Sequence, residues 1–196
     1  MDAMDSERVA NKLSQESAIG VIPTDTIYGV VARAGDAAAV ERLYAVKRRE
    51  SKPGTLIAAS IDQLEELGLK RRYLTAIQQY WPGPISVIIP CADPSLAYLH
   101  RGKMSLAVRL PDDKKLHDLL KRTGPLLTSS ANRSGEPPAN TIEEAKKYFG
   151  DKVDFYTDGG DLSANQPSTI IRIVDDAIEI IREGAVKINE AGREIT

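Results

Sequence analysis

Several short segments of this 196-residue chain combine hydroxyl, amide and cationic side chains in a way that suits the binding of an anion. The stretch 23–30, PTDTIYGV, follows an apolar run over 18–22 and carries Thr24, Asp25 and Thr26. Because proline ends a strand's hydrogen-bond ladder, these side chains are expected at the end of a strand, where α/β proteins place ligands. Polar residues also end apolar runs in segments 46–57, 106–111 and 126–138.

Cations gather in segment 46–57, where Lys47, Arg49 and Lys52 lie within six positions. In an extended chain Lys47 and Arg49 point to the same side, so both can face one anion. A triphosphate needs such compensation, with arginine binding two oxygens and lysine acting as a point charge. The alternative is a solvated helix end, where the macrodipole favours cations.

Other polar residues allow two interpretations each. Ser130 and Asn132 stand beside a glycine turn and could donate to phosphate oxygens, although this is also a common loop composition. Arg109 lies in an apolar strand, LAVRLP, so it needs either a carboxylate ligand or an internal ion pair with an aspartate. Ser168 and Arg182 border two β-rich runs and could serve only the hairpin there.

Hydrophobic periodicity and caps predict helices that alternate with strands. The expected helices cover 6–15, a segment capped by Asp36, 62–80 in two pieces around Gly68, 112–120, and 142–149 capped by Thr141. The expected strands cover 18–22, 55–60, 86–90, 105–111 and 126–130, followed by a hairpin of 168–174 and 177–183. This order predicts a single α/β domain, residues 1–196, with a mixed, twisted sheet.

Composition excludes several classes of protein. The single cysteine, Cys91, rules out a disulfide framework and a multi-cysteine metal site. No apolar run approaches the roughly 20 residues of a membrane span, so a cytoplasmic location without membrane contact is expected. The net charge of −2 argues against a polycationic nucleic-acid binder. Residues 1–130 nevertheless carry 18 Lys and Arg against 15 Asp and Glu, which permits a local basic surface.

In this order and at these spacings, the motifs resemble the YrdC-like domain of the threonylcarbamoyl-AMP synthase family, in its short single-domain form. The motifs are PTDTIYGV, KRRESKP, WPGP, AVRLP, SSANRSG, PSTII and IREG. The resemblance implies a twisted mixed sheet flanked by helices, with a concave ligand cavity. It also implies a nucleotidyltransferase that makes threonylcarbamoyl-adenylate and pyrophosphate from L-threonine, bicarbonate and ATP, for the threonylcarbamoyladenosine modification of tRNA.

The resemblance also implies roles for particular residues. Lys47 and Arg49 would be catalytic through the ATP phosphates. The implied ATP site comprises Lys47, Arg49, Lys52, Ser130, Asn132 and Arg182. The implied threonine site comprises Thr26, Arg109, Thr128 and Ser168. Mg²⁺ would arrive with the triphosphate, without a dedicated protein metal site.

The chain departs from the family pattern at two positions. Many relatives have proline directly after the K-x-R motif and histidine at the end of the next strand, where this chain has Glu50 and Ile57. The missing histidine concerns the threonine site, whereas the cations that would face ATP are kept.

Implied partners beyond the substrates are tRNA or duplex RNA and a downstream threonylcarbamoyl transferase complex. One competing hypothesis is a non-catalytic RNA-binding paralogue, whose binding would fall steeply with salt. Another keeps the chemistry but changes the amine, as in the carbamoyl-adenylate-forming domain of hydrogenase maturation proteins.

Overall fold

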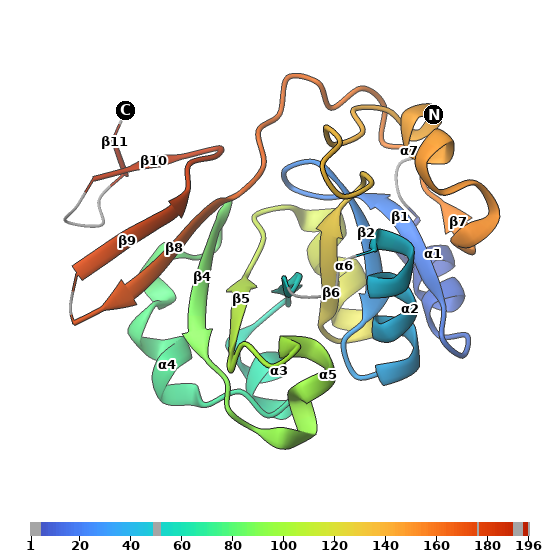
Figure 1. Ribbon diagram of the computed structural model, residues 1–196. Coiled ribbons are helices and arrows are strands. Elements are labelled where there is room, and N and C mark those ends of the chain that lie inside the picture. Colours follow the sequence, from blue (N-terminus) through green and yellow to red (C-terminus); the bar gives the residue numbers. More distant parts are fainter. Residues whose placement is uncertain (1–4, 49–51, 176, 190–193, 196) are drawn as a thin grey trace.

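A large mixed sheet organises the chain in the computed structural model, which describes residues 5–48, 52–175, 177–189 and 194–195 (Figure 1). Its nine strands follow the order β7-β1-β2-β6-β3-β5-β4-β8-β9. They are β1 (Ile19–Pro23), β2 (Tyr28–Arg33), β3 (Thr55–Ile57), β4 (Ile85–Pro90), β5 (Ser105–Arg109), β6 (Leu126–Ser130), β7 (Phe155–Tyr156), β8 (Thr169–Val174) and β9 (Ala177–Arg182). A separate pair joins β10 (Lys187–Ile188) to β11 (Glu194–Ile195).

Parallel and antiparallel pairs alternate irregularly through this sheet. The pairs β1/β7, β3/β5 and β4/β8 are parallel, whereas the other neighbours run antiparallel. Parallel pairs require long crossovers, which the helices and loops provide. The predicted fold class, a twisted mixed sheet flanked by helices, is confirmed.

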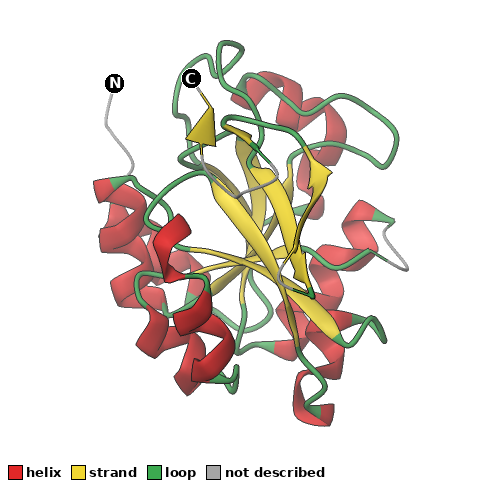
Figure 2. Ribbon diagram, turned by 90° about the vertical axis from the view of Figure 1, so that its left-hand side faces the viewer, coloured by secondary structure: helices red, strands yellow, loops and turns green. Residues whose placement is uncertain are grey.

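Helices cover both faces of the sheet, which Figure 2 shows nearly edge-on. They are α1 (Ser6–Leu13), α2 (Ala37–Lys47), α3 (Ile61–Glu66), α4 (Arg71–Ala76), α5 (Ala97–His100), α6 (Lys114–Thr123) and α7 (Ile142–Phe149), with short 3-10 turns η1 (Gln78–Tyr80), η2 (Pro94–Leu96) and η3 (Gly150–Lys152). No helix in the described ranges is long and apolar enough to cross a membrane.

Two apolar cores result from the alternation of side chains along the strands. In β2, Val30 belongs to the larger core beneath α2, α5 and α7, while Val31 belongs to the smaller core beneath α1 and α6. Both valines are fully buried, because successive side chains of a strand point to opposite faces. A strand buried on both sides reads as a continuous apolar run rather than an alternating one.

Most predicted elements are present, with shifted ends. The Asp36 carboxylate accepts a hydrogen bond from Ala39 N at 2.9 Å and caps α2, as expected. The predicted strand over 55–60 stops at Ile57, because Ser60 instead caps α3. Helix α6 begins after Asp113 and extends to Thr123, beyond the predicted 112–120. Strand β2 is absent from the predicted elements.

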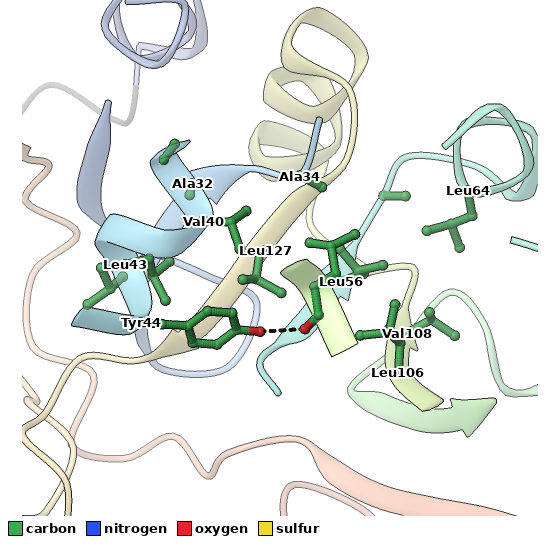
Figure 3. Packing of buried hydrophobic residues seen from close by; sticks show 14 of the residues in the cluster. Ala32, Ala34, Val40, Leu43, Tyr44, Leu56, Leu64, Leu106, Val108 and Leu127 are labelled. Carbon is green, nitrogen blue, oxygen red and sulfur yellow. Dashed lines mark hydrogen bonds between the residues drawn. The ribbon is translucent and has the colours of Figure 1, made fainter. Parts of the chain in front are cut away.

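A buried tyrosine links the larger core to the start of the central strand β3 (Figure 3). The hydroxyl of Tyr44, on α2, donates to Leu99 O at 2.8 Å and accepts from Gly54 N at 3.1 Å. Gly54 directly precedes β3, so this phenol fixes the chain where it enters the sheet.

Replacing Tyr44 by phenylalanine is expected to lower the free energy of unfolding by about 1–3 kcal/mol, since it leaves a buried N–H and a buried C=O unpaired. Urea unfolding followed by circular dichroism measures this change. Tyr148→Phe is the matched control, because it removes an exposed bond to Pro137 O and should change stability by less than about 0.5 kcal/mol. Equal effects in the two variants would contradict the structural role of Tyr44.

Candidate active site

A cavity of about 490 Å³ lies over the central strands and is lined by both polar and apolar side chains. Ala107 and Arg109 of β5 face it, whereas the alternating Leu106 and Val108 pack into the larger core. The cavity therefore lies on the opposite face of the sheet from the larger core. This volume is of the size that binds small molecules.

The strand register explains which side chains meet on the cavity floor. Thr55 of β3 is paired with Ala107 on one side and with Thr128 of β6 on the other. All three line the cavity. Ile57, two residues after Thr55 on the same strand, belongs to the smaller core, so the cavity and helices α1 and α6 share one face of the sheet.

Five cationic side chains line the cavity, and no carboxylate does so within the described ranges. The cations are Lys52, Lys103, Arg109, Arg172 and Arg182. Arg109 is ion-paired with Asp25, and Arg172 with Glu179. The remaining positive charge in a concave site attracts anions and favours their binding.

Two of these cations flank the start of neighbouring parallel strands. Because Thr55 pairs with Ala107, Lys52 and Lys103 precede β3 and β5 at nearly the same level of the sheet. Both side chains are exposed, and neither forms an ion pair in the part of the chain that the structure describes. They can therefore compensate two negative groups of one ligand.

At the opposite end of β5, Arg109 is buried and paired with Asp25. Arg109 Nη2 donates to Asp25 Oδ1 at 2.8 Å, and the two side chains are 4% and 5% exposed. Burial raises the pKa of the Asp25 carboxyl above its usual range, although the charge and hydrogen bond of Arg109 act in the opposite direction. Of the two possibilities open for Arg109, the structure shows the internal ion pair, and Arg109 still lines the cavity.

Serine hydroxyls continue this buried polar cluster. Arg109 Nη1 donates to Ser86 Oγ at 3.3 Å, and Ser86 Oγ donates to Ser168 Oγ at 3.0 Å. Arg182 donates from Nη2 to both the carbonyl and the hydroxyl of Ser168, at 2.6 and 3.2 Å. Arg182, placed in the ATP site by the sequence resemblance, therefore lies beside Ser168 of the expected threonine site.

The segment 157–168, called the strap below, crosses one end of the sheet from β7 to β8 (Figure 1). Asn165 Nδ2 donates to Thr26 O at 2.8 Å, which ties the strap to the polar turn after β1. Thr24 Oγ1 holds that turn by donating to Ile27 O at 2.7 Å. The buried Thr26 lines the cavity, so the turn and the strap together enclose one end of it.

Lys47 has a different environment from the one expected. Its ammonium group donates to Ser130 O at 2.6 Å, Asn132 O at 2.5 Å and Asn132 Oδ1 at 2.8 Å, and the residue is 3% exposed. Ser130 lines the cavity, whereas Lys47 and Asn132 are not among the lining residues. In this structure Lys47 stabilises the loop after β6, and its contact with phosphate stays a prediction.

The predicted site residues are thus largely brought together. Those that line the cavity are Thr26, Lys52, Arg109, Thr128, Ser130, Ser168 and Arg182. Arg49, the second predicted catalytic residue, and Glu50 lie outside the described residues. Ile57, at the position of the family histidine, is fully buried and is paired with Arg109 across β3 and β5.

The prediction missed three residues of this site, namely Ser86, Lys103 and Arg172, and it named Asp25 in the polar turn without pairing it with Arg109. Alternation along STIIRIV could have placed Arg172 on the same side as Ser168. No local signal marks Ser86, whose neighbours Ile85 and Val87 are core residues.

The fold and cavity define an α/β protein whose central cavity is lined by cationic and hydroxyl side chains. The sequence profile of the Sua5/YciO/YrdC family, described as telomere recombination, matches residues 12–184, and the chain belongs to this family.

Similar proteins agree with this assignment. The threonylcarbamoyl-AMP synthase of Chromohalobacter salexigens is 34% identical over 171 residues, which cover 84% of this chain and 92% of that protein. The synthase of Bacillus subtilis is 30% identical over 182 residues, covering 90% of this chain but 53% of the longer relative. The crystal structure of P. abyssi Sua5 complexed with L-threonine aligns with a TM-score of 0.81 at 25% identity, over 94% of this chain and 56% of that one.

Lys47→Met is expected to lower the free energy of unfolding by about 1.5–3 kcal/mol, because it leaves three oxygens of the loop after β6 without a charged donor. Chemical denaturation measures the change. Lys52→Met, at an exposed position, is the control and should stay within about 0.5 kcal/mol of the wild type. A Lys47→Met protein of unchanged stability would mean that the loop oxygens do not depend on Lys47.

Proposed function

We propose that this protein is an L-threonylcarbamoyl-AMP synthase, which converts L-threonine, bicarbonate and ATP into threonylcarbamoyl-adenylate and pyrophosphate. The observation that supports this most is the cavity itself, with a buried arginine and serine at one end and exposed lysines at the other. Family membership and the names of the relatives point to the same reaction. The adenylate would then serve tRNA modification through a downstream threonylcarbamoyl transferase complex, in the cytoplasm.

Threonine would bind at the buried end. Its carboxylate accepts hydrogen bonds, and Arg109 and Ser168 can donate them there. Thr26 and Thr128 would contact the rest of the amino acid. A Cβ at Gly29 would lie 2.5 Å from Thr128 Oγ1, so the glycine leaves room for that hydroxyl beside the cavity.

ATP would bind toward the lysine end. Lys52, Lys103 and Ser130 would meet phosphate oxygens there, and Arg182 would contact the nucleotide from its position beside Ser168. Arg49 and Lys47 keep the phosphate contacts implied by the sequence resemblance. Mg²⁺ would come bound to the triphosphate, since the lining residues of the described chain include no carboxylate to hold it.

Catalysis would rest on positioning and charge neutralisation. The amine of threonine and bicarbonate form a carbamate with loss of water. A carbamate oxygen then attacks the α-phosphorus of ATP while the bond to the bridging oxygen breaks and pyrophosphate leaves. A carbamate reverts readily to CO₂, so a site that excludes water protects it. The cations would stabilise charge on the pyrophosphate without acting as nucleophile or base.

Pyrophosphate release by the purified protein tests the proposal. We expect release that requires both threonine and bicarbonate, together with detection of the adenylate by mass spectrometry. Release with another amine would keep the chemistry and change the substrate. No release from folded protein would contradict the synthase assignment, and salt-sensitive binding of tRNA or duplex RNA would then favour the RNA-binding paralogue.

Lys103→Ala and Lys52→Ala should each raise KM for ATP by about tenfold, the cost of one charge-assisted hydrogen bond, with little change in KM for threonine. Steady-state assays at varied ATP measure this. Lys70→Ala, an exposed lysine at the start of α4, provides a control with unchanged kinetics. If both cavity variants kept the wild-type KM for ATP, the phosphates of ATP would not bind at Lys52 and Lys103.

Arg109→Lys should raise KM for threonine more than tenfold while KM for ATP stays within about twofold. Lysine keeps a charge for Asp25 but lacks the planar fork that binds a carboxylate through two N–H groups. Thermal unfolding monitors the fold, because this change alters a buried ion pair. Equal losses for both substrates would argue against a carboxylate at Arg109.

A further inference from the structure

A continuous chain of buried hydrogen bonds runs beneath one end of the cavity, from Asp25 through Arg109 and Ser86 to Ser168. The register of β4 with β5, in which Val87 pairs with Val108, brings Ser86 beside Arg109. Ser86 is 0% exposed and is not a lining residue, whereas Arg109 and Ser168 both line the cavity. Ser86 thus acts only through these two neighbours.

The chemistry of arginine fixes the direction of this chain. A guanidinium group can only donate, so Ser86 Oγ must accept from Arg109 Nη1. The hydroxyl hydrogen of Ser86 then remains for Ser168 Oγ, 3.0 Å away. Arg182 Nη2 also donates to Ser168 Oγ, at 3.2 Å. Ser168 Oγ therefore accepts two hydrogen bonds.

These two accepted hydrogen bonds determine what the hydroxyl hydrogen of Ser168 can do. A serine hydroxyl has one hydrogen and two lone pairs, and here both lone pairs are used. The Ser168 hydrogen is left to donate, and Ser168 lines the cavity. Without Ser86, one lone pair of Ser168 would be free, and the hydroxyl could accept from a ligand as readily as donate to it.

We propose that Ser86 is a positioning residue that keeps Ser168 as a hydrogen-bond donor toward the cavity and holds Arg109 at its side. Arg109 and Ser168 then offer only donors to the cavity, which suits a carboxylate and opposes a ligand group that must donate to them, such as an amide. This inference rests on the proposed function, in which that carboxylate belongs to L-threonine.

The surroundings of the buried Ser86 favour a role for its hydroxyl group over a role in filling space within β4. Ile85 and Val87, the neighbours of Ser86 on β4, point to the opposite face and pack in the larger core. An alanine at position 86 would fit the same space without a polar atom. The serine instead completes a contact between two side chains from other strands, β5 and the start of β8.

Calorimetric titration of the Ser86→Ala protein with L-threonine, and separately with ATP, tests the proposal. We expect Kd for threonine to rise about threefold to tenfold, the range for one hydrogen bond, while Kd for ATP stays within about twofold. The preference for threonine over L-threoninamide should narrow by a similar factor. Ser86→Thr keeps the hydroxyl and should restore most of the threonine affinity.

Thr123→Val is the matched control, because Thr123 is a buried hydroxyl at the end of α6 that bonds to Leu119 O and lies outside the cavity. It should leave both affinities unchanged. Unchanged threonine affinity in Ser86→Ala, or equal losses for threonine and ATP, would overturn the role of Ser86. If the wild-type protein itself binds no threonine and releases no pyrophosphate, the proposed function fails instead, so the two failures are distinguishable.

Discussion

The buried charge of Arg109 is the constraint on which the site depends. An unpaired guanidinium in the interior costs several kcal/mol, so the fold must supply an anion and acceptors around it. Asp25 supplies the charge from the turn after β1, and Ser86 supplies a hydroxyl from β4. These partners come from segments that are distant in the sequence and meet only in the sheet. The shape of the cavity floor therefore depends on the register of its strands.

Electrostatic balance divides the other cations into two groups. Lys47 is buried, and its ammonium group donates to oxygens of Ser130 and Asn132, which fixes Ser130 at the cavity wall. Lys52 and Lys103 have no carboxylate partner in the described parts of the chain and remain exposed. A buried cation whose hydrogen bonds are made within the protein stabilises the fold. An exposed cation without such bonds gives up fewer contacts with the protein when it binds a ligand. The difference lies in burial rather than in residue type.

The sequence predicted what depends on local chemistry. Asp36 marked the start of α2, and the apolar surroundings of Arg109 in LAVRLP predicted that it needs an anionic partner, which is Asp25 within the protein. Strand β2 escaped prediction although it is as buried as the predicted β1, because its apolar run follows the polar turn without a break that marks the start of a separate element. The pairing of Asp25 with Arg109 joins residues 84 positions apart, and that of Lys47 with Ser130 joins residues 83 apart. No local pattern reports such contacts, because they depend on strand order and register.

The two ends of the cavity differ in a way that orients a ligand. Arg109 and Ser105 lie at opposite ends of β5, about 13 Å apart at the usual rise of a strand. At one end the cation is buried and already paired, so it adds directed donors but little net charge. At the other end Lys52 and Lys103 add net positive charge that is open to solvent.

A singly charged carboxylate gains most from directed donors, whereas a polyanion gains most from unpaired charge. Between the two ends, Ala107 and Ile88 lie beside the hydroxyl side chains of Thr55 and Thr128. A ligand with both kinds of group would therefore bind in one direction, with its reacting centre over these middle strands.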